Sequence, residues 1–277
     1  MTSSYHDRVR IADEYLNCSV YLYPSYESAD SGRWAGGSGF LVHSQWYDVN
    51  GLKESVFVVT NRHVIHGMKG KDPHLRVNLK SGGTKVLRTN LQRWVNHPEN
   101  DDISAYEFLE FEEDHDLLAL EERAFIRPDT VERYNIGIGD QIAMIGRLVE
   151  HDGKIRNSPC ARFGSIAMMP GEGLKAAFRD DQETFLVDCW SLAGFSGSPV
   201  IAFMPHPARG AEALLNVESW VLGVNWMHVT EETKVQQSCV LDKPPYVSTN
   251  TGVAGVIPAW RIRRLLDSMK PDVMRTF

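Results

Sequence analysis

One serine, one histidine and several carboxyl groups lie in segments whose composition suits acyl transfer. Ser196 lies in GFSGSP (194–199), where the glycines permit positive φ and a close approach of the backbone. A serine hydroxyl is a weak nucleophile near neutral pH, so it needs a nearby base and a carboxylate that fixes the tautomer of that base. It also needs donors for the developing oxyanion, which the N–H groups of a tight turn supply. Alone, GFSGSP is more typical of a surface loop.

The histidine that suits the base lies in FVVTNRHVIHG (57–67), where His63 follows an apolar segment that predicts a buried strand. A base at the end of such a strand has a fixed position and one side open to solvent, which suits general-base catalysis. Alone, His63 is more typical of a structural histidine. His66 allows a two-histidine metal site, but no third ligand has a suitable spacing, so we expect no metal.

Two acidic segments can supply the carboxylate. Asp101 and Asp102 precede an apolar run in HPENDDISAYEF (97–108), and Asp116 precedes another in EEDHDLLALEE (112–122). Acidic residues next to strands are usually solvated turn residues, so neither segment identifies the acid by itself.

The elements that must position these groups are short β segments separated by turn residues. This pattern favours barrels or a sandwich over alternating strands and helices. The expected strands cover 19–23, 39–44, 55–61, 75–80, 85–94, 103–111, 141–146, 161–169, 184–190, 199–204, 219–227 and 253–258.

The β pattern is interrupted twice along the chain. The polar stretch 121–138 separates two halves of similar strand number, and 258–269 begins with Pro258 and has apolar residues at helical spacing. We therefore expect five parts. They are an N-terminal extension with a possible helix (1–16), a first β-barrel (17–120), a connecting segment (121–138), a second β-barrel (139–258), and a C-terminal helix and tail (259–277).

Composition excludes several classes of partner. The chain has 277 residues, 43% hydrophobic and 23% charged, which is typical of a globular protein. Its formal charge of −7 and lack of a basic run argue against nucleic acid or an anionic membrane as the partner. No secretion signal or membrane-spanning run is visible, and the four cysteines are scattered, which favours reduced thiols and a cytoplasmic location.

Taken together, these segments resemble the chymotrypsin-like (trypsin-fold) serine peptidases, and most closely the bacterial trypsin-like branch that includes the HtrA-type proteases. VVTNRHVI (58–65) is similar to that family's histidine segment. GFSGSPV (194–200) is similar to its GxSGGP serine segment, with Ser198 at the second glycine. GSGFLV (37–42) and NTGVAGVIP (250–258) resemble its opening and closing strands. The matching segments occur in the family's order.

The resemblance implies an all-β fold of two packed six-stranded antiparallel β-barrels with a C-terminal helix. His63 and the aspartate would come from the first barrel, and Ser196 from the second. The resemblance favours Asp102 as the acid, because the family's aspartate begins a strand shortly after a His-Pro pair, here at 97–98. Asp116 is the alternative acid.

The implied activity is that of a serine endopeptidase acting on protein or peptide substrates through an acyl-enzyme. His63 would take the proton of Ser196, Asp102 would orient His63, and the N–H groups of Gly194 and Ser196 would hold the oxyanion. No metal or cofactor is required. The alternative is a catalytically silent module of the same fold, used for binding or as a scaffold.

Two features depart from the best-known relatives. Phe195 stands where digestive-type relatives carry an aspartate that pairs with a new N-terminal amine, so we expect control through loop order, an oligomer or a regulatory protein partner. Because the chain ends soon after the expected helix, we expect no PDZ domain of the kind that HtrA-type relatives append.

The residues that would line the substrate pocket are Trp190, Asn225 and Trp226. They indicate a pocket for small or apolar side chains, although the tryptophans are equally typical of a core. The long polar segment 228–250 is expected as a loop that covers the pocket or extends into solvent.

Overall fold

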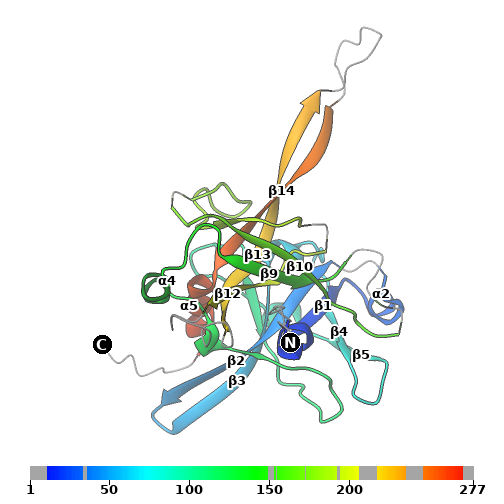
Figure 1. Ribbon diagram of the computed structural model, residues 1–277. Helices are drawn as coiled ribbons and strands as arrows, with labels where there is room; N and C mark the ends of the chain where they lie inside the picture. The colour runs from blue at the N-terminus through cyan, green and yellow to red at the C-terminus, as the bar shows by residue number, and fades with distance from the viewer. Residues whose placement is uncertain are drawn as a thin grey trace, which may run out of the picture.

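A computed structural model of the chain describes residues 11–33, 36–148, 153, 155–171, 173–191, 194–205, 217–234 and 246–270. The chain forms two β modules, with a C-terminal helix packed against them and a long two-stranded ribbon projecting from the second module (Figure 1). This arrangement confirms the expected all-β fold with a C-terminal helix. None of the helices in these residues has the length and apolar character required to span a bilayer.

The first module is an eight-stranded sheet in the order β5-β4-β1-β2-β3-β7-β6, with β8 paired parallel to β2. It has two strands more than expected, because β6 and β8 have only two residues each and are too short to give a periodic pattern. The strands are β1 (Ser19–Tyr23), β2 (Gly37–Asp48), β3 (Gly51–Thr60), β4 (His74–Asn78), β5 (Thr84–Arg88), β6 (Val95–Asn96), β7 (Ser104–Glu107) and β8 (Leu120–Glu121).

The second module is a closed six-stranded barrel in the order β10-β11-β14-β13-β12-β9. All neighbouring strands in it are antiparallel. The strands are β9 (Gln141–Gly146), β10 (Cys160–Met168), β11 (Phe185–Asp188), β12 (Pro199–Pro205), β13 (Val217–Lys234) and β14 (Tyr246–Pro258).

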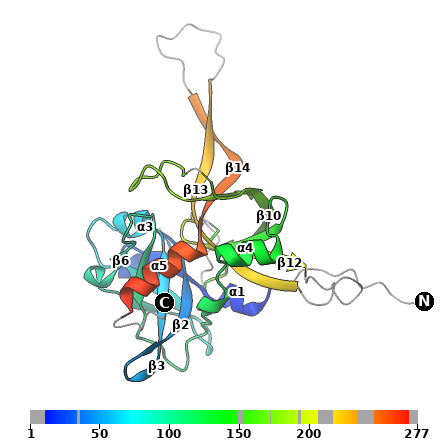
Figure 2. The same cartoon turned by 90° about the vertical axis from the view of Figure 1, so that its left-hand side faces the viewer.

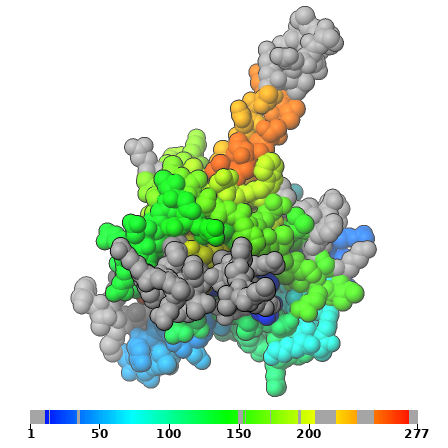
Figure 3. All heavy atoms as spheres, viewed as in Figure 1, coloured from blue at the N-terminus to red at the C-terminus, as the bar shows by residue number. Residues whose placement is uncertain are grey.

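The segment 228–250 is not simply a loop. Its two ends continue β13 and β14, which pair from Thr230↔Asn250 to Lys234↔Tyr246 and form the projecting ribbon. The space-filling view shows the ribbon as a narrow arm standing away from the body of the molecule (Figure 3). Residues 235–245 lie outside the described part of the chain.

The helices are short except at the C-terminus. They are α1 (Asp13–Asn17), α2 (Tyr26–Ser31), α3 (Arg62–His66), α4 (Pro128–Tyr134) and α5 (Ala259–Met269), with 3₁₀ turns η1 (Leu91–Arg93) and η2 (Glu122–Ala124). The expected strand 85–94 was too long, because Asn90 caps η1 by accepting a hydrogen bond from the Gln92 N–H at 2.9 Å. Residues 1–10 of the expected N-terminal extension lie outside the described part.

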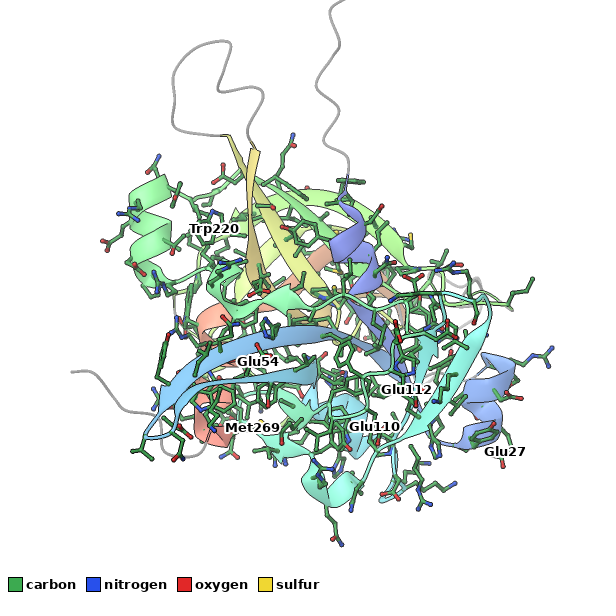
Figure 4. The ribbon with its side chains drawn as sticks, turned by 90° about the horizontal axis from the view of Figure 1, so that it is seen from below. Glu27, Glu54, Glu110, Glu112, Trp220 and Met269 are labelled. Atoms are coloured by element: carbon green, nitrogen blue, oxygen red, sulfur yellow. The ribbon has the colours of Figure 1, made fainter. Side chains whose placement is uncertain are left out.

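One buried cluster joins the two modules and α5. It contains Phe40 and Phe57 from the first module, Ile142 from the second, and Ile262 and Leu266 from α5. The helix begins after Pro258 and lies against both modules (Figure 2). The residues that it buries are apolar and have helical spacing. On another side of the barrel, Tyr134 of α4 packs on Trp220, with ring centroids 5.4 Å apart. Figure 4 labels Trp220, which lies beside α4.

Candidate active site

His63 lies on α3, which begins directly after β3 ends at Thr60. Val64 and Ile65 are buried and fix this short helix against the first module. Asn61, which precedes the helix, donates from Nδ2 to the backbone oxygen of Asp102 at 3.0 Å. The end of β3 is therefore tied to the segment that carries the acid.

Asp102 makes two contacts with His63. Its Oδ2 lies 2.5 Å from His63 Nδ1, and its Oδ1 accepts the His63 backbone N–H at 2.8 Å. The Asp102 backbone N–H in turn donates to Gln182 Oε1 at 3.0 Å. Because a carboxylate accepts only, the proton of neutral His63 lies on Nδ1, which leaves the Nε2 lone pair free to accept another proton.

Asp116 lies elsewhere. Its Oδ2 accepts from Arg156 at 2.8 Å, and its backbone N–H donates to Asn78 at 2.9 Å. Of the two acids that the sequence left open, the structure brings Asp102 and not Asp116 to His63.

Ser196 lies in a turn directly before β12. Gly194 and Gly197 have φ of 95° and 85°, a conformation that favours glycine. The Gly197 N–H donates to Asn225 of β13 at 2.9 Å, and the Ser196 carbonyl accepts from the Ser38 N–H at 2.8 Å. A Cβ on Gly197 would lie 2.0 Å from the Ser38 oxygen, so no larger residue fits there.

The serine turn lies next to α3. A Cβ on Gly37 would lie 2.7 Å from Val64 Cγ2 and 3.1 Å from the Ser196 oxygen, which places both beside the start of β2. Within the described residues, Ser196 Oγ and His63 Nε2 make no hydrogen bond. In enzymes of this chemistry that bond often tightens only when substrate binds.

The N–H groups expected to hold the oxyanion are those of Gly194 and Ser196. Neither donates to another group within the described part of the chain. The Gly194 carbonyl accepts from Ser38 Oγ at 2.7 Å, which orients the peptide plane that follows it. Residues 192 and 193 lie outside the described part.

Phe195, directly before the serine, is fully buried in the core shared by both modules. The guanidinium of Arg162 lies 5.5 Å from the centre of its ring. The residue before Ser196 therefore holds the turn by packing and not by an ion pair.

Ser198 is matched by Gly146 at the end of β9. The Ser198 side chain is buried, and a Cβ on Gly146 would lie 1.9 Å from its Oγ. The serine that replaces the second glycine of the motif therefore fits because its neighbour has no side chain.

We expect Gly146→Ala to lower the free energy of unfolding by about 1–3 kcal/mol, the usual cost of overpacking. Ser198→Gly in the same chain should restore part of the loss, because it removes the closest clash. The rest should remain, since the new Cβ would still lie 3.0 Å from Phe195 Cδ1. Urea unfolding of the two single variants and the double variant measures this coupling. Strictly additive effects would show that Gly146 and Ser198 do not compete for space.

The three residues expected to line a pocket lie in different environments. Asn225 is buried and donates from Nδ2 to the Phe195 oxygen at 2.9 Å, so it supports the serine turn from behind. Trp226 is also buried, whereas Trp190 is 52% exposed. Trp190 packs beside Gly252 of β14, where a Cβ would lie 3.4 Å from its ring.

A buried ion cluster next to the acid was not expected from the sequence. Asp101 is fully buried, and its Oδ1 accepts from Arg179 at 2.5 Å. Its Oδ2 accepts from Arg261 of α5, which also donates to Glu99 at 2.6 Å. Asp101 thus connects the segment before β7 to the loop between β10 and β11 and to α5. No local sequence pattern distinguishes Asp101 from a solvated turn residue.

His97 is buried beside this cluster, and its Nδ1 accepts the Glu99 N–H at 3.2 Å. Burial lowers its pKa from 6.5 to about 4. The unfolded chain therefore binds this proton at a higher pH than the folded chain does. The stability that depends on a neutral His97 is present above pH 6.5 and is lost as the pH falls towards 4.

We expect the free energy of unfolding to fall by about 1–2 kcal/mol between pH 6.5 and 5 because of this group. In His97→Gln the decrease over the same interval should be smaller, because glutamine does not titrate. Urea unfolding at several pH values in this range measures both slopes. Equal slopes for the two proteins would contradict the assignment.

Among the described residues, no three His, Cys, Asp or Glu side chains are arranged to hold a metal ion. His66 packs edge-on against Phe178, with ring centroids 6.1 Å apart. Cys18 Sγ donates to the Tyr15 oxygen at 3.2 Å. Cys160 and Cys189 form no disulfide within the described residues, and Cys239 lies outside them.

The fold and the geometry around His63 define a trypsin-like architecture. Residues 37–203 match the model of the trypsin-like peptidase domain, and the chain belongs to this family. The matched range contains His63, Asp102 and Ser196. No curated protein matches the sequence.

Solved structures show the same fold at low sequence identity. The MamO protease domain from Magnetospirillum magneticum is 14% identical, covers 90% of this chain and 96% of its own, and has a TM-score of 0.52. The HtrA-type protease AlgW, solved with a tripeptide, is 15% identical with a TM-score of 0.53. The match covers 93% of this chain and 61% of that chain.

Proposed function

We propose that the protein is a serine endopeptidase that hydrolyses peptide bonds through Ser196, His63 and Asp102. The observation that carries the proposal is the 2.5 Å contact between His63 Nδ1 and Asp102 Oδ2, next to a turn that presents Ser196. Membership of the trypsin-like peptidase family supports it.

In the proposed mechanism, His63 Nε2 takes the hydroxyl proton as Ser196 Oγ attacks the substrate carbonyl. Asp102 keeps the other proton on Nδ1 and stabilises the imidazolium that forms. The N–H groups of Gly194 and Ser196 bind the oxyanion, and losing one such donor typically costs about 10²–10³ in rate. His63 then returns the proton to the leaving amine, and water releases the acyl group by the reverse sequence.

Proteins or peptides are the proposed substrates. AlgW has been solved with a tripeptide and with a decapeptide, which supports this substrate class for the shared fold. For control, we propose loop order, an oligomer or a protein partner. The buried apolar Phe195 supports this, because it has no group to receive an N-terminal amine.

A fluorophosphonate probe tests the proposal on the full-length chain, with its intact mass verified by mass spectrometry. The expected result is labelling of wild type but not of Ser196→Ala, and complete protection by prior treatment with an unlabelled fluorophosphonate. Ser198→Ala, which removes the neighbouring hydroxyl, serves as the matched control and should still be labelled.

The second candidate is a silent binding module of the same fold. It is favoured by one observation, the absence of a hydrogen bond between Ser196 Oγ and His63 Nε2 within the described residues. Failure of the probe to label wild type, both alone and with added peptides, would favour this candidate over the endopeptidase.

A further inference from the structure

Among the described strands, none pairs with the outer edge of β13 along the projecting ribbon. β12 pairs with β13 only as far as Pro199↔Val224, whereas β13 continues to Lys234. Beyond Val224 the paired neighbour of β13 among the described strands is β14, on its other edge. One row of backbone groups therefore stays available over about ten residues of strand, which is long for an edge.

This free edge begins at the candidate nucleophile. The Gly197 N–H donates to the Asn225 oxygen at 2.9 Å, and the Asn225 N–H donates to the Ser198 oxygen at 2.9 Å. These bonds continue the pairing of β12 with β13 up to the turn that carries Ser196. A chain segment that places a carbonyl at Ser196 can thus run on along β13 in the position that β12 has vacated.

The direction of the backbone groups follows from two hydroxyl contacts. The carbonyls of Val229 and Glu231 accept from Thr251 Oγ1 at 2.9 Å and from Thr249 Oγ1 at 3.3 Å, so both carbonyls point towards β14. Peptide groups alternate along a strand. The N–H and C=O groups of Glu232, like those of Thr230, therefore point to the outer edge.

The ribbon also carries two adjacent glutamates on β13. Glu231 and Glu232 are exposed and lie opposite Thr249 and Ser248, which carry no charge. Within the described residues neither carboxylate makes an ion pair. An incoming strand with lysine or arginine at the matching positions would gain favourable electrostatic contacts.

We propose that the outer edge of β13, over 227–233, binds the N-terminal side of an extended polypeptide substrate as a third strand. Lysine or arginine is preferred roughly five to eight residues before the scissile bond, a range that follows from the strand spacing and allows for the bulges in β13. This inference rests on the proposed endopeptidase function and gives it a substrate class: long, unfolded segments with basic residues upstream of the cleaved bond. Strand addition of this kind gives affinity through the main chain and preference through side chains.

The binding test uses Ser196→Ala, which lacks the proposed nucleophile, so that binding is measured without cleavage. The probes are fluorescein-labelled peptides whose C-terminal residue would lie next to Ser196. One has twelve residues with lysines six and seven positions before its end, one has glutamates there, and one keeps only the last four residues. Fluorescence anisotropy should give a Kd for the twelve-residue lysine peptide about tenfold below those of the other two.

Two proline variants distinguish the contributions of the two edges of the ribbon to peptide binding. Glu232→Pro removes an N–H that points to the outer edge of β13, and Glu232→Gln shows how much of its effect is charge. Ser248→Pro is the matched control, because Ser248 lies opposite Glu232 and its N–H points to the other edge of the ribbon. We expect Glu232→Pro to weaken binding of the long peptide about tenfold and Ser248→Pro to leave it unchanged.

Equal affinity for the long and short peptides would overturn the proposal, and so would equal effects of the two proline variants. The length comparison uses the unmodified ribbon, so it stands even where a proline variant disturbs folding. Fluorophosphonate labelling separates the two ideas. If the probe labels the protein but the Kd does not depend on peptide length, only the edge proposal is disproved. If binding depends on the outer edge of β13 but the probe does not label the protein, the peptidase is disproved and a peptide-binding module remains.

Discussion

Asp102→Asn is expected to lower kcat for peptide hydrolysis by about 10⁴ while the fold is retained. Asp102 Oδ2 lies 2.5 Å from His63 Nδ1, so the carboxylate keeps a proton on that nitrogen and leaves Nε2 free as a base. An asparagine amide can donate to Nδ1 and so favours the other tautomer, in which Nε2 carries the proton and cannot accept one. Turnover of a peptide that wild type cleaves measures the change.

Asp116→Asn is the matched control for this experiment. It makes the same chemical change at an acid that pairs with Arg156 at 2.8 Å and has no contact with His63. It should keep kcat within about twofold of wild type, because an exposed pair of this kind contributes little. A large loss of activity in Asp116→Asn together with a small loss in Asp102→Asn would mean that Asp116, and not Asp102, is the acid.

Asp101→Ala is expected to lower the free energy of unfolding by about 3 kcal/mol, the scale for removing one partner from a buried ion cluster. Asp101 is fully buried between the guanidinium groups of Arg179 and Arg261. Without it, two partly buried positive charges lose a shared partner, although Arg261 keeps Glu99 and Arg179 keeps Asp181. For a chain of this size the loss corresponds to a decrease in Tm of about 6–12 °C.

Thermal and urea unfolding of Asp101→Ala, with Asp116→Ala as the exposed counterpart, test this expectation. Asp116 is partly open to solvent, so its removal should cost less than about 1 kcal/mol. A loss of the same size in both variants would mean that burial of Asp101 adds nothing to its contribution.

Much of the fold could be predicted because most strands leave a clear pattern. All six strands of the second module were expected near their observed positions, since each has an apolar run at its centre. The two-residue strands β6 and β8 were not, because they are too short for any periodicity. The ribbon was interpreted as a loop because both of its faces are exposed, so its residues do not alternate between apolar and polar.

The site could be predicted only as far as local motifs reach. The sequence segments around His63 and Ser196 have a distinctive composition. The acid was less certain from local motifs, with Asp102 favoured by the resemblance and Asp116 as the alternative. Gln182 and the ion cluster could not be found, because Asp101 and Asp102 bind residues 78 to 160 positions away. The cytoplasmic location stays a prediction.

Ser38 of the first module has a consequence for the order of events during folding. It donates to the Ser196 and Gly194 carbonyls, and its Oγ accepts the Arg147 N–H at 3.1 Å. These partners lie 109 to 158 residues after Ser38 in the chain. The bonds therefore form only after the second half of the chain has been synthesised and has docked on the first. A nascent chain thus carries Ser196 in an unsupported segment until its two halves meet. For the proposed endopeptidase, hydrolytic competence would then appear as one of the last steps of maturation.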